Sequence, residues 1–151
     1  MKTAYEEQVA ALAEASGAKI EIDENRVATM MVEGRVVQLK PSDEAESGMV
    51  AFTIVATAGD DGRFERGTLE SALALNLFGA QTDKGSIGLF GDALFLSKEI
   101  ALDGATPEML AEKLLAFARL AGELARELVG DKGGDGEVAA SFGGIGGFIQ
   151  V

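Results

Sequence analysis

The sequence contains no histidine, no cysteine and no tryptophan. Without cysteine, the chain has no disulfide, no thiolate metal site and no thiol nucleophile. Without histidine, it lacks the most common general base and the most common neutral metal ligand. Carboxylates and lysines remain, but this composition favours a protein that binds and does not catalyse. We therefore expect no enzymatic activity, no cofactor and no bound metal.

Long hydrophobic runs are also missing. No segment reaches the roughly 18 consecutive apolar residues that a membrane-spanning helix needs. The first ten residues mix charged and helix-forming residues, without the apolar centre of a signal peptide. We expect a cytoplasmic protein that does not act on a membrane.

Positive charge is scarce. The chain carries 25 acidic and 13 basic residues, a formal net charge of -12 and a sequence pI of about 4.4. A field of this sign opposes binding to nucleic acid and to anionic lipid, and it favours partners with basic segments. The length of 151 residues and the 47% hydrophobic content suit a single globular domain with one core.

The spacing of apolar residues predicts three helices, at residues 3–16, 65–78 and 107–129. Thr3 and Glu6 have the spacing of a capping box at the first helix. Thr106 is a candidate cap for the last helix, and Pro107 occupies its first turn, where a missing N–H is tolerated. One apolar stripe follows the last helix: Leu110, Leu114, Phe117, Ala121, Leu124 and Leu128.

Segments rich in β-branched and aromatic residues predict strands at residues 27–32, 35–40, 49–58, 87–90 and 93–97. Glu33-Gly34 and Gly91-Asp92 are candidate hairpin turns. A further short alternating segment occupies residues 19–22. Helices and strands do not alternate one by one, so the order helix–three strands–helix–two strands–helix predicts an α+β fold with a mostly antiparallel, twisted sheet.

The composition changes after residue 130. We expect residues 1–130 to form the α+β domain and residues 131–151 to form a flexible, glycine-rich C-terminal tail. The glycines at 143–147 are not a phosphate loop, because no strand precedes them and no helix follows. The acidic residues at 131–137 are not a calcium loop either, because Phe142 stands where the twelfth-position carboxylate belongs.

The strand at residues 49–58 is apolar on both faces. Val50, Phe52 and Ile54 point to one side, and uncharged residues also point to the other. A half-solvated antiparallel sheet normally alternates apolar with polar residues. Either the helices and the tail cover both faces, or a partner covers what remains. Apolar surface beside a sheet edge suits the addition of an extended peptide as a further strand.

The most specific pattern is a leucine-rich helix with Asn76 near its end (residues 69–79), a short hairpin (85–96) and a long final helix (102–128). With its small size and acidity, the chain resembles the class I type III secretion chaperones, the CesT/Tir-chaperone family, over residues 3–129. The resemblance implies a secretion-chaperone-like fold and a homodimer in the bacterial cytoplasm. It implies that the protein binds the extended N-terminal segment of a secreted effector and keeps that effector export-competent, without a cofactor.

The resemblance also implies two sets of contact residues. The second helix and the following strand would form the dimer interface, through Leu69, Leu73, Asn76, Leu77, Ile87 and Leu89. The first helix and the sheet would contact the effector, through Val9, Leu12, Met30, Val32, Val37, Phe52 and Ile54. The sequence does not separate surface from core within the second set.

Two other interpretations remain open at this point. One is a YbjN-like regulatory or adaptor module, unrelated to secretion, that shares the α+β plan and binds a folded partner. The other is an enzyme that uses carboxylates or a divalent metal, for which the acidic clusters at 43–46 and 60–61 are the candidates. Carboxylates in such turns are normally solvated, whereas acid–base chemistry needs them opposed and buried.

Overall fold

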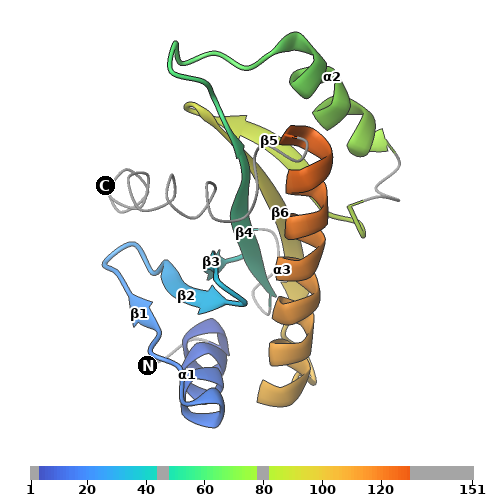
Figure 1. The fold of residues 1–151 in the computed structure, drawn as a ribbon. Helices are drawn as coiled ribbons and strands as arrows, with labels where there is room; N and C mark the ends of the chain where they lie inside the picture. The colour runs from blue at the N-terminus through green and yellow to red at the C-terminus, as the bar shows by residue number, and fades with distance from the viewer. Residues whose placement is uncertain (1–3, 44–47, 78–81, 130–151) are drawn as a thin grey trace.

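The computed structural model describes residues 4–43, 48–77 and 82–129. Within these ranges the chain forms three helices and a six-stranded antiparallel sheet (Figure 1). The elements are α1 (Ala4–Ser16), β1 (Glu21–Ile22), β2 (Ala28–Val32), β3 (Arg35–Pro41), β4 (Gly48–Thr57), α2 (Arg66–Leu75), β5 (Ser86–Phe90), β6 (Ala93–Ala101) and α3 (Pro107–Val129). The α+β prediction is confirmed, with one strand more than expected before α2.

That additional strand is β1, which comprises two residues and pairs with β2 at the sheet edge. The strand order is β1-β2-β3-β4-β6-β5, so β5 forms the opposite edge. Glu33 and Gly34 join β2 to β3 with φ values of 50° and 78°. Positive φ at both positions matches the twist of the paired strands, which confirms the predicted hairpin turn. Strand β6 extends beyond the predicted 93–97 because it pairs with β4 as far as Gly48.

The long helix α3 forms as its sequence predicts. All six residues of its apolar stripe are buried. The Met109 backbone N–H donates a hydrogen bond to Thr106 Oγ1 (3.2 Å), so Thr106 caps the helix. Helix α1 buries Tyr5, Val9 and Leu12 and packs against α3.

The main core lies between the three helices and one face of the sheet, the inner face. Every buried apolar side chain of the described helices belongs to this cluster, together with strand residues such as Val37, Ala51 and Leu96. The alternate strand residues project to the other face, the outer face. A second, separate cluster on the outer face consists of buried Ile54 and Ala93 with Val36 and Phe95 packed against them.

Several predictions fall outside the described residues: the Thr3 half of the capping box, the end of the second helix at residue 78, and the glycine-rich tail at 131–151. In the portion of the chain that the structure covers, no helix is both long enough and apolar enough to cross a membrane.

Candidate interaction surfaces

Helix α2 and strand β5 together present large apolar side chains to solvent. Leu73, Leu77 and Leu89 are exposed by 72%, 64% and 59%. Leu89 shares the strand parity of Ile87, which packs into the main core, so Leu89 lies on the side of the sheet that α2 occupies. We call Leu73, Leu77 and Leu89 the α2–β5 patch. Three exposed leucines on neighbouring elements are typical of an interaction surface.

Asn76 positions this patch. Its Nδ2 donates a hydrogen bond to the Ile87 carbonyl oxygen (2.8 Å), and its Oδ1 accepts one from the Ile87 N–H (2.6 Å). Asn76 is also the C-cap residue of α2. The side chain therefore acts as a bridge that fixes the end of α2 against the edge strand.

The six residues predicted for the dimer interface thus divide by position. Leu73, Leu77 and Leu89 are exposed, Leu69 and Asn76 are half-buried, and Ile87 is buried. Phe90, which the prediction omitted, is also exposed and projects to the outer face from the same edge strand. Phe90 alternates with Ile87 and Leu89 along β5, so its side chain points to the opposite face of the sheet. This alternation in the sequence indicates a second apolar side of β5.

The outer face of the sheet is the second candidate surface. At its centre Phe52 and Phe95 pack edge to face, with ring centroids 6.3 Å apart and planes at 60°. Gln38 lies opposite Phe52 in the register of β3 and β4, and its Nε2 donates a hydrogen bond to Thr29 Oγ1 (3.2 Å). These side chains form an apolar floor with one amide group.

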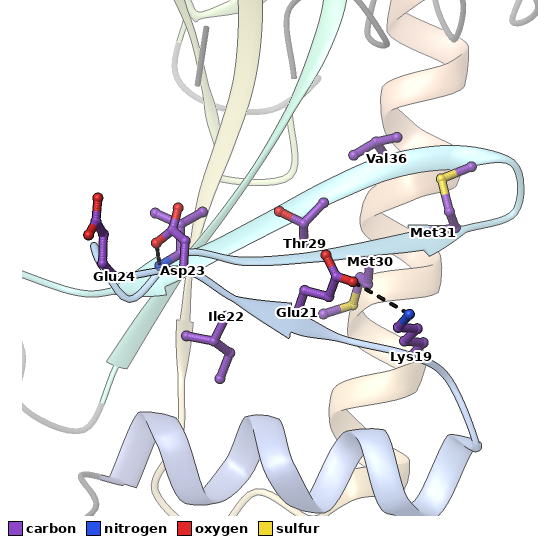
Figure 2. A pocket seen from close by; sticks show the side chains of 10 residues that line it. Lys19, Glu21, Ile22, Asp23, Glu24, Thr29, Met30, Met31 and Val36 are labelled. Carbon is purple, nitrogen blue, oxygen red and sulfur yellow. Dashed lines mark hydrogen bonds and ion pairs between the residues drawn. The ribbon is translucent and has the colours of Figure 1, made fainter. Parts of the chain in front are cut away.

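Towards the β1 edge, the outer face is hollowed. The hollow has a volume of about 600 Å³ and is lined by side chains from β1, β2, β3 and the turn between β1 and β2 (Figure 2). Exposed Met31 and half-buried Val36 give it apolar walls, while Lys19 and Glu21 form an ion pair at 3.6 Å along its side. Because β1 has only two residues, most of β2 carries no strand on that side, which leaves room for an extended segment.

The residues predicted for effector contact are mostly core residues. Five of the seven side chains are buried: Val9, Leu12, Met30, Val37 and Ile54. The first four belong to the main core, and Ile54 belongs to the outer cluster. Alternating apolar residues produce the same sequence pattern at a core face and at a binding face. The predicted effector-contact set therefore combined core residues with surface residues. Val32 and Phe52 are half-buried and remain accessible to a partner.

Shifted titratable groups are not gathered in one place. The Arg119 guanidinium holds the pKa of Glu33 below its usual value through two hydrogen bonds, of 3.0 and 3.2 Å. A hydrogen bond from Lys98 Nζ (2.6 Å) likewise lowers the pKa of Asp83. Burial raises the pKa of Tyr5 to about 12. Each of these described groups makes a structural contact within the fold.

The acidic clusters likewise lie in solvent where the structure describes them. Asp43, Asp60 and Asp61 are exposed. Among the described residues, no three Asp, Glu, His or Cys side chains lie close enough together to hold a metal ion. Within the described ranges, the geometry offers surfaces for binding, and these three aspartates lie in solvated turns.

The model of the Tir chaperone protein (CesT) family matches residues 8–125 of the chain. No curated protein sequence matches the chain significantly.

Solved structures share the fold at low sequence identity. The Yersinia pestis type III secretion chaperone SycH, in complex with a stable fragment of YscM2, is 23% identical with a TM-score of 0.57, covering 80% of this chain and 98% of that one. A chain of the ExsC–ExsE complex is 18% identical with a TM-score of 0.65, covering 84% and 97%. A chain of the HopA1–SchA chaperone–effector complex is 12% identical with a TM-score of 0.58, covering 83% and 92%.

Proposed function

The chain belongs to the Tir chaperone protein (CesT) family, and from this membership we propose that it is a type III secretion chaperone. As a homodimer in the bacterial cytoplasm, it binds the extended N-terminal segment of a secreted effector and keeps that effector export-competent. The observation that carries the proposal is the family match, which extends from α1 into α3 and so includes every described strand.

The structural neighbours support a protein partner. SycH is described as a type III secretion chaperone bound to a fragment of another protein, and the HopA1–SchA structure as a chaperone–effector complex. Applied to this chain, these relationships favour an effector segment over a folded regulatory partner.

The α2–β5 patch is suited to the dimer contact. A pair of chains related by twofold symmetry would bury Leu73, Leu77 and Leu89 of both copies against each other. Half-buried Leu69 lies on the same helix and would extend the contact. Asn76 and Ile87 would support the interface from behind, because their hydrogen bonds keep α2 and β5 in place.

The outer face and its hollow are suited to the effector. An extended segment can pair with the incompletely covered edge of β2 and place apolar side chains against Met31, Val36 and Phe52. The net charge of -12 favours a segment that carries basic residues. Binding of this kind involves no bond making or breaking, so the protein acts without catalysis and without a cofactor.

Deleting the gene in its own host tests the proposal. Secretion of each effector is then measured with and without the reintroduced gene. We expect one effector, or a small number, to be lost from the secreted fraction while the others are unaffected. The N-terminal segment of the affected effector should also co-purify with this chain. Unchanged secretion of every effector would contradict the proposal.

A further inference from the structure

A second hollow opens on the outer face, away from β1. It has a volume of about 370 Å³, and β3, β4, β5 and β6 all contribute to its walls. We call it the β6 hollow, and the hollow described above the β1 hollow. Lys40, Val50 and Glu99 line it and lie opposite one another in the register of β3, β4 and β6. Val50 is two residues from Phe52, so this set of side chains lies on the outer face.

The β6 hollow gathers positive charge in an acidic molecule. Three of the 13 basic residues of the chain line it, namely Lys40, Lys84 and Lys98. Lys98 Nζ lies 2.6 Å from Asp83 Oδ2, and Lys40 Nζ lies 4.0 Å from the exposed Asp43. Lys84 makes no ion pair with any residue that the structure describes. Its ammonium group is therefore available to a partner.

The two hollows differ in charge balance. The β1 hollow is lined by one lysine and three carboxylates: Lys19, with Glu21, Asp23 and Glu24. The β6 hollow is lined by its three lysines and two carboxylates, those of Asp43 and Glu99. A cationic side chain therefore fits the β1 hollow, and a carboxylate fits the β6 hollow.

One row of side chains joins the two hollows across the sheet. In the strand register these residues lie side by side from β1 to β5: Glu21, Thr29, Gln38, Phe52, Ser97 and Ser86. The first two line the β1 hollow, and the last two line the β6 hollow. Six strands are separated by five spacings of about 4.8 Å, so the row is about 24 Å long. An extended segment covers that length in about seven residues.

Gln38, in the middle of the row, offers an unused acceptor. Its Oε1 atom is buried and has no hydrogen-bond partner among the described residues, whereas its Nε2 donates to Thr29 Oγ1. Buried polar atoms of folded proteins are nearly always paired. An N–H group of a segment that lies along the row would supply the missing donor.

We propose that the β6 hollow binds an acidic side chain of the effector's extended segment, about seven residues away from a basic side chain held in the β1 hollow. The segment crosses the outer face along the row, and one of its N–H groups donates to Gln38 Oε1. This inference rests on the proposed function, since it uses the surface assigned to the effector. It gives the partner a charge pattern: basic at one end, apolar over Phe52 and acidic at the other end.

Synthetic peptides test the charge pattern without an effector. The probe has about ten residues, with a lysine near one end, a glutamate about seven positions away and alternating valine and threonine between them. A central tryptophan reports binding, because the chain itself contains none. We expect a Kd at least about threefold lower than that of the same peptide with glutamine in place of glutamate.

This comparison separates a local site from general attraction. Long-range attraction to a chain of net charge -12 favours the glutamine peptide, which is the more positive of the two. Tighter binding of the glutamate peptide therefore indicates a local basic site, and the difference should shrink in about 1 M salt. Equal Kd values, or no binding of either peptide, would overturn the proposal.

Charge reversal in the full-length chain locates the site. Lys84→Glu should raise the Kd of the glutamate peptide about fivefold, because an attractive pair becomes a repulsive one. A peptide with lysine in place of that glutamate should regain the lost affinity. The matched control is Arg66→Glu, which makes the same change in charge at a 92% exposed side chain on α2. Circular dichroism checks that both variants fold, and equal effects on the Kd would refute the location.

The effector segment that co-purifies with the chain provides the last test. It should carry a basic and an acidic residue about seven positions apart, and Lys84→Glu should raise its Kd about fivefold. An unchanged Kd would contradict the role of the β6 hollow in effector binding. The peptide tests use no effector, so a failure of the charge pattern and a failure of the secretion function are distinguishable.

Discussion

At the scale of single residues, two side chains join segments that lie far apart in the sequence. The Tyr5 hydroxyl lies 2.8 Å from the carbonyl oxygens of both Arg26 and Leu39, which ties α1 to β3 and to the turn before β2. Asn76 ties α2 to β5 through the two hydrogen bonds with Ile87. Both contacts are mainly polar, so their loss leaves backbone groups without partners, and the effect is measurable.

Tyr5 gives a prediction in alkaline solution. Its pKa is raised by burial to about 12, whereas that of an unfolded tyrosine is about 10. Between these values the unfolded state releases a proton that the folded state keeps, so the free energy of unfolding falls as the pH rises. The stabilisation is fully present below about pH 10 and is lost towards pH 12. Urea unfolding across this window should therefore show a steeper decline for the unmodified chain than for Tyr5→Phe.

The same variant has an expected cost at neutral pH. Tyr5→Phe should lose about 1–2 kcal/mol of unfolding free energy, because two carbonyl oxygens lose the hydroxyl. Parallel pH profiles for the two proteins would contradict the role given to Tyr5.

Asn76→Ala should destabilise the fold by about 1–3 kcal/mol, since it leaves the N–H and the carbonyl of Ile87 without partners. Thermal unfolding measures the effect. The matched control is Ser71→Ala on the same helix, whose side chain is exposed and should change little. Equal unfolding temperatures for the two variants would show that the bridge does not hold α2.

At the scale of elements, α2 shows that a leucine stripe in the sequence does not decide which side of a helix is buried. Leu69, Leu73 and Leu77 share a stripe in the sequence, yet the buried residues of α2 are Ala72 and Leu75. The leucines at 73 and 77 face outward, because α2 packs into the main core through Ala72 and Leu75. A helix with apolar residues on two sides is consistent with one partner inside the chain and another outside it.

A charged residue introduced on the outward side of α2 allows dimer formation and folding to be tested separately. Leu73→Asp should break the proposed dimer, because burying an unpaired carboxylate costs several kcal/mol. The monomer should keep its unfolding free energy, since the side chain is 72% exposed there. Sizing with light scattering and circular dichroism measure the two effects. Ser71→Asp is the control for added charge, and a variant Leu73→Asp that remains dimeric would place the interface elsewhere.

Sequence reasoning predicted the elements better than the surfaces. The strong periodicity of α3 and the turn residues of the β2–β3 hairpin determine local structure by themselves. The length of β6 and the two-residue β1 depend on pairing with strands distant in the sequence, which local patterns do not contain. Likewise Val37 and Phe52 read alike as apolar strand residues, and only packing distinguishes the buried from the half-buried one.

At the scale of the whole molecule, the two sheet edges are suited to different proposed partners. The β5 edge, with the α2–β5 patch, is suited to a second copy of the chain, and the β1 edge with its hollow is suited to an effector. Since these edges lie at opposite ends of the strand order, a dimer formed through one leaves the other accessible.

The molecular mass checks this arrangement first. Light scattering on a sizing column should give a mass near twice 15.6 kDa at micromolar concentration. The mass should change little between low and high salt, because the proposed contact is apolar and salt screens only charge. A mass near 15.6 kDa would leave the fold unaffected and would contradict the homodimer.

The packing of α1 on α3 has a consequence for protein synthesis. Gln8 of α1 donates a hydrogen bond to the Ala105 carbonyl oxygen, across 97 positions of the sequence. At about 5–20 residues per second, a ribosome needs roughly 5–20 seconds to make the residues between them. During that interval Tyr5, Val9 and Leu12 have been translated but lack the helix that covers them. The nascent chain is therefore most vulnerable to aggregation before its last helix emerges.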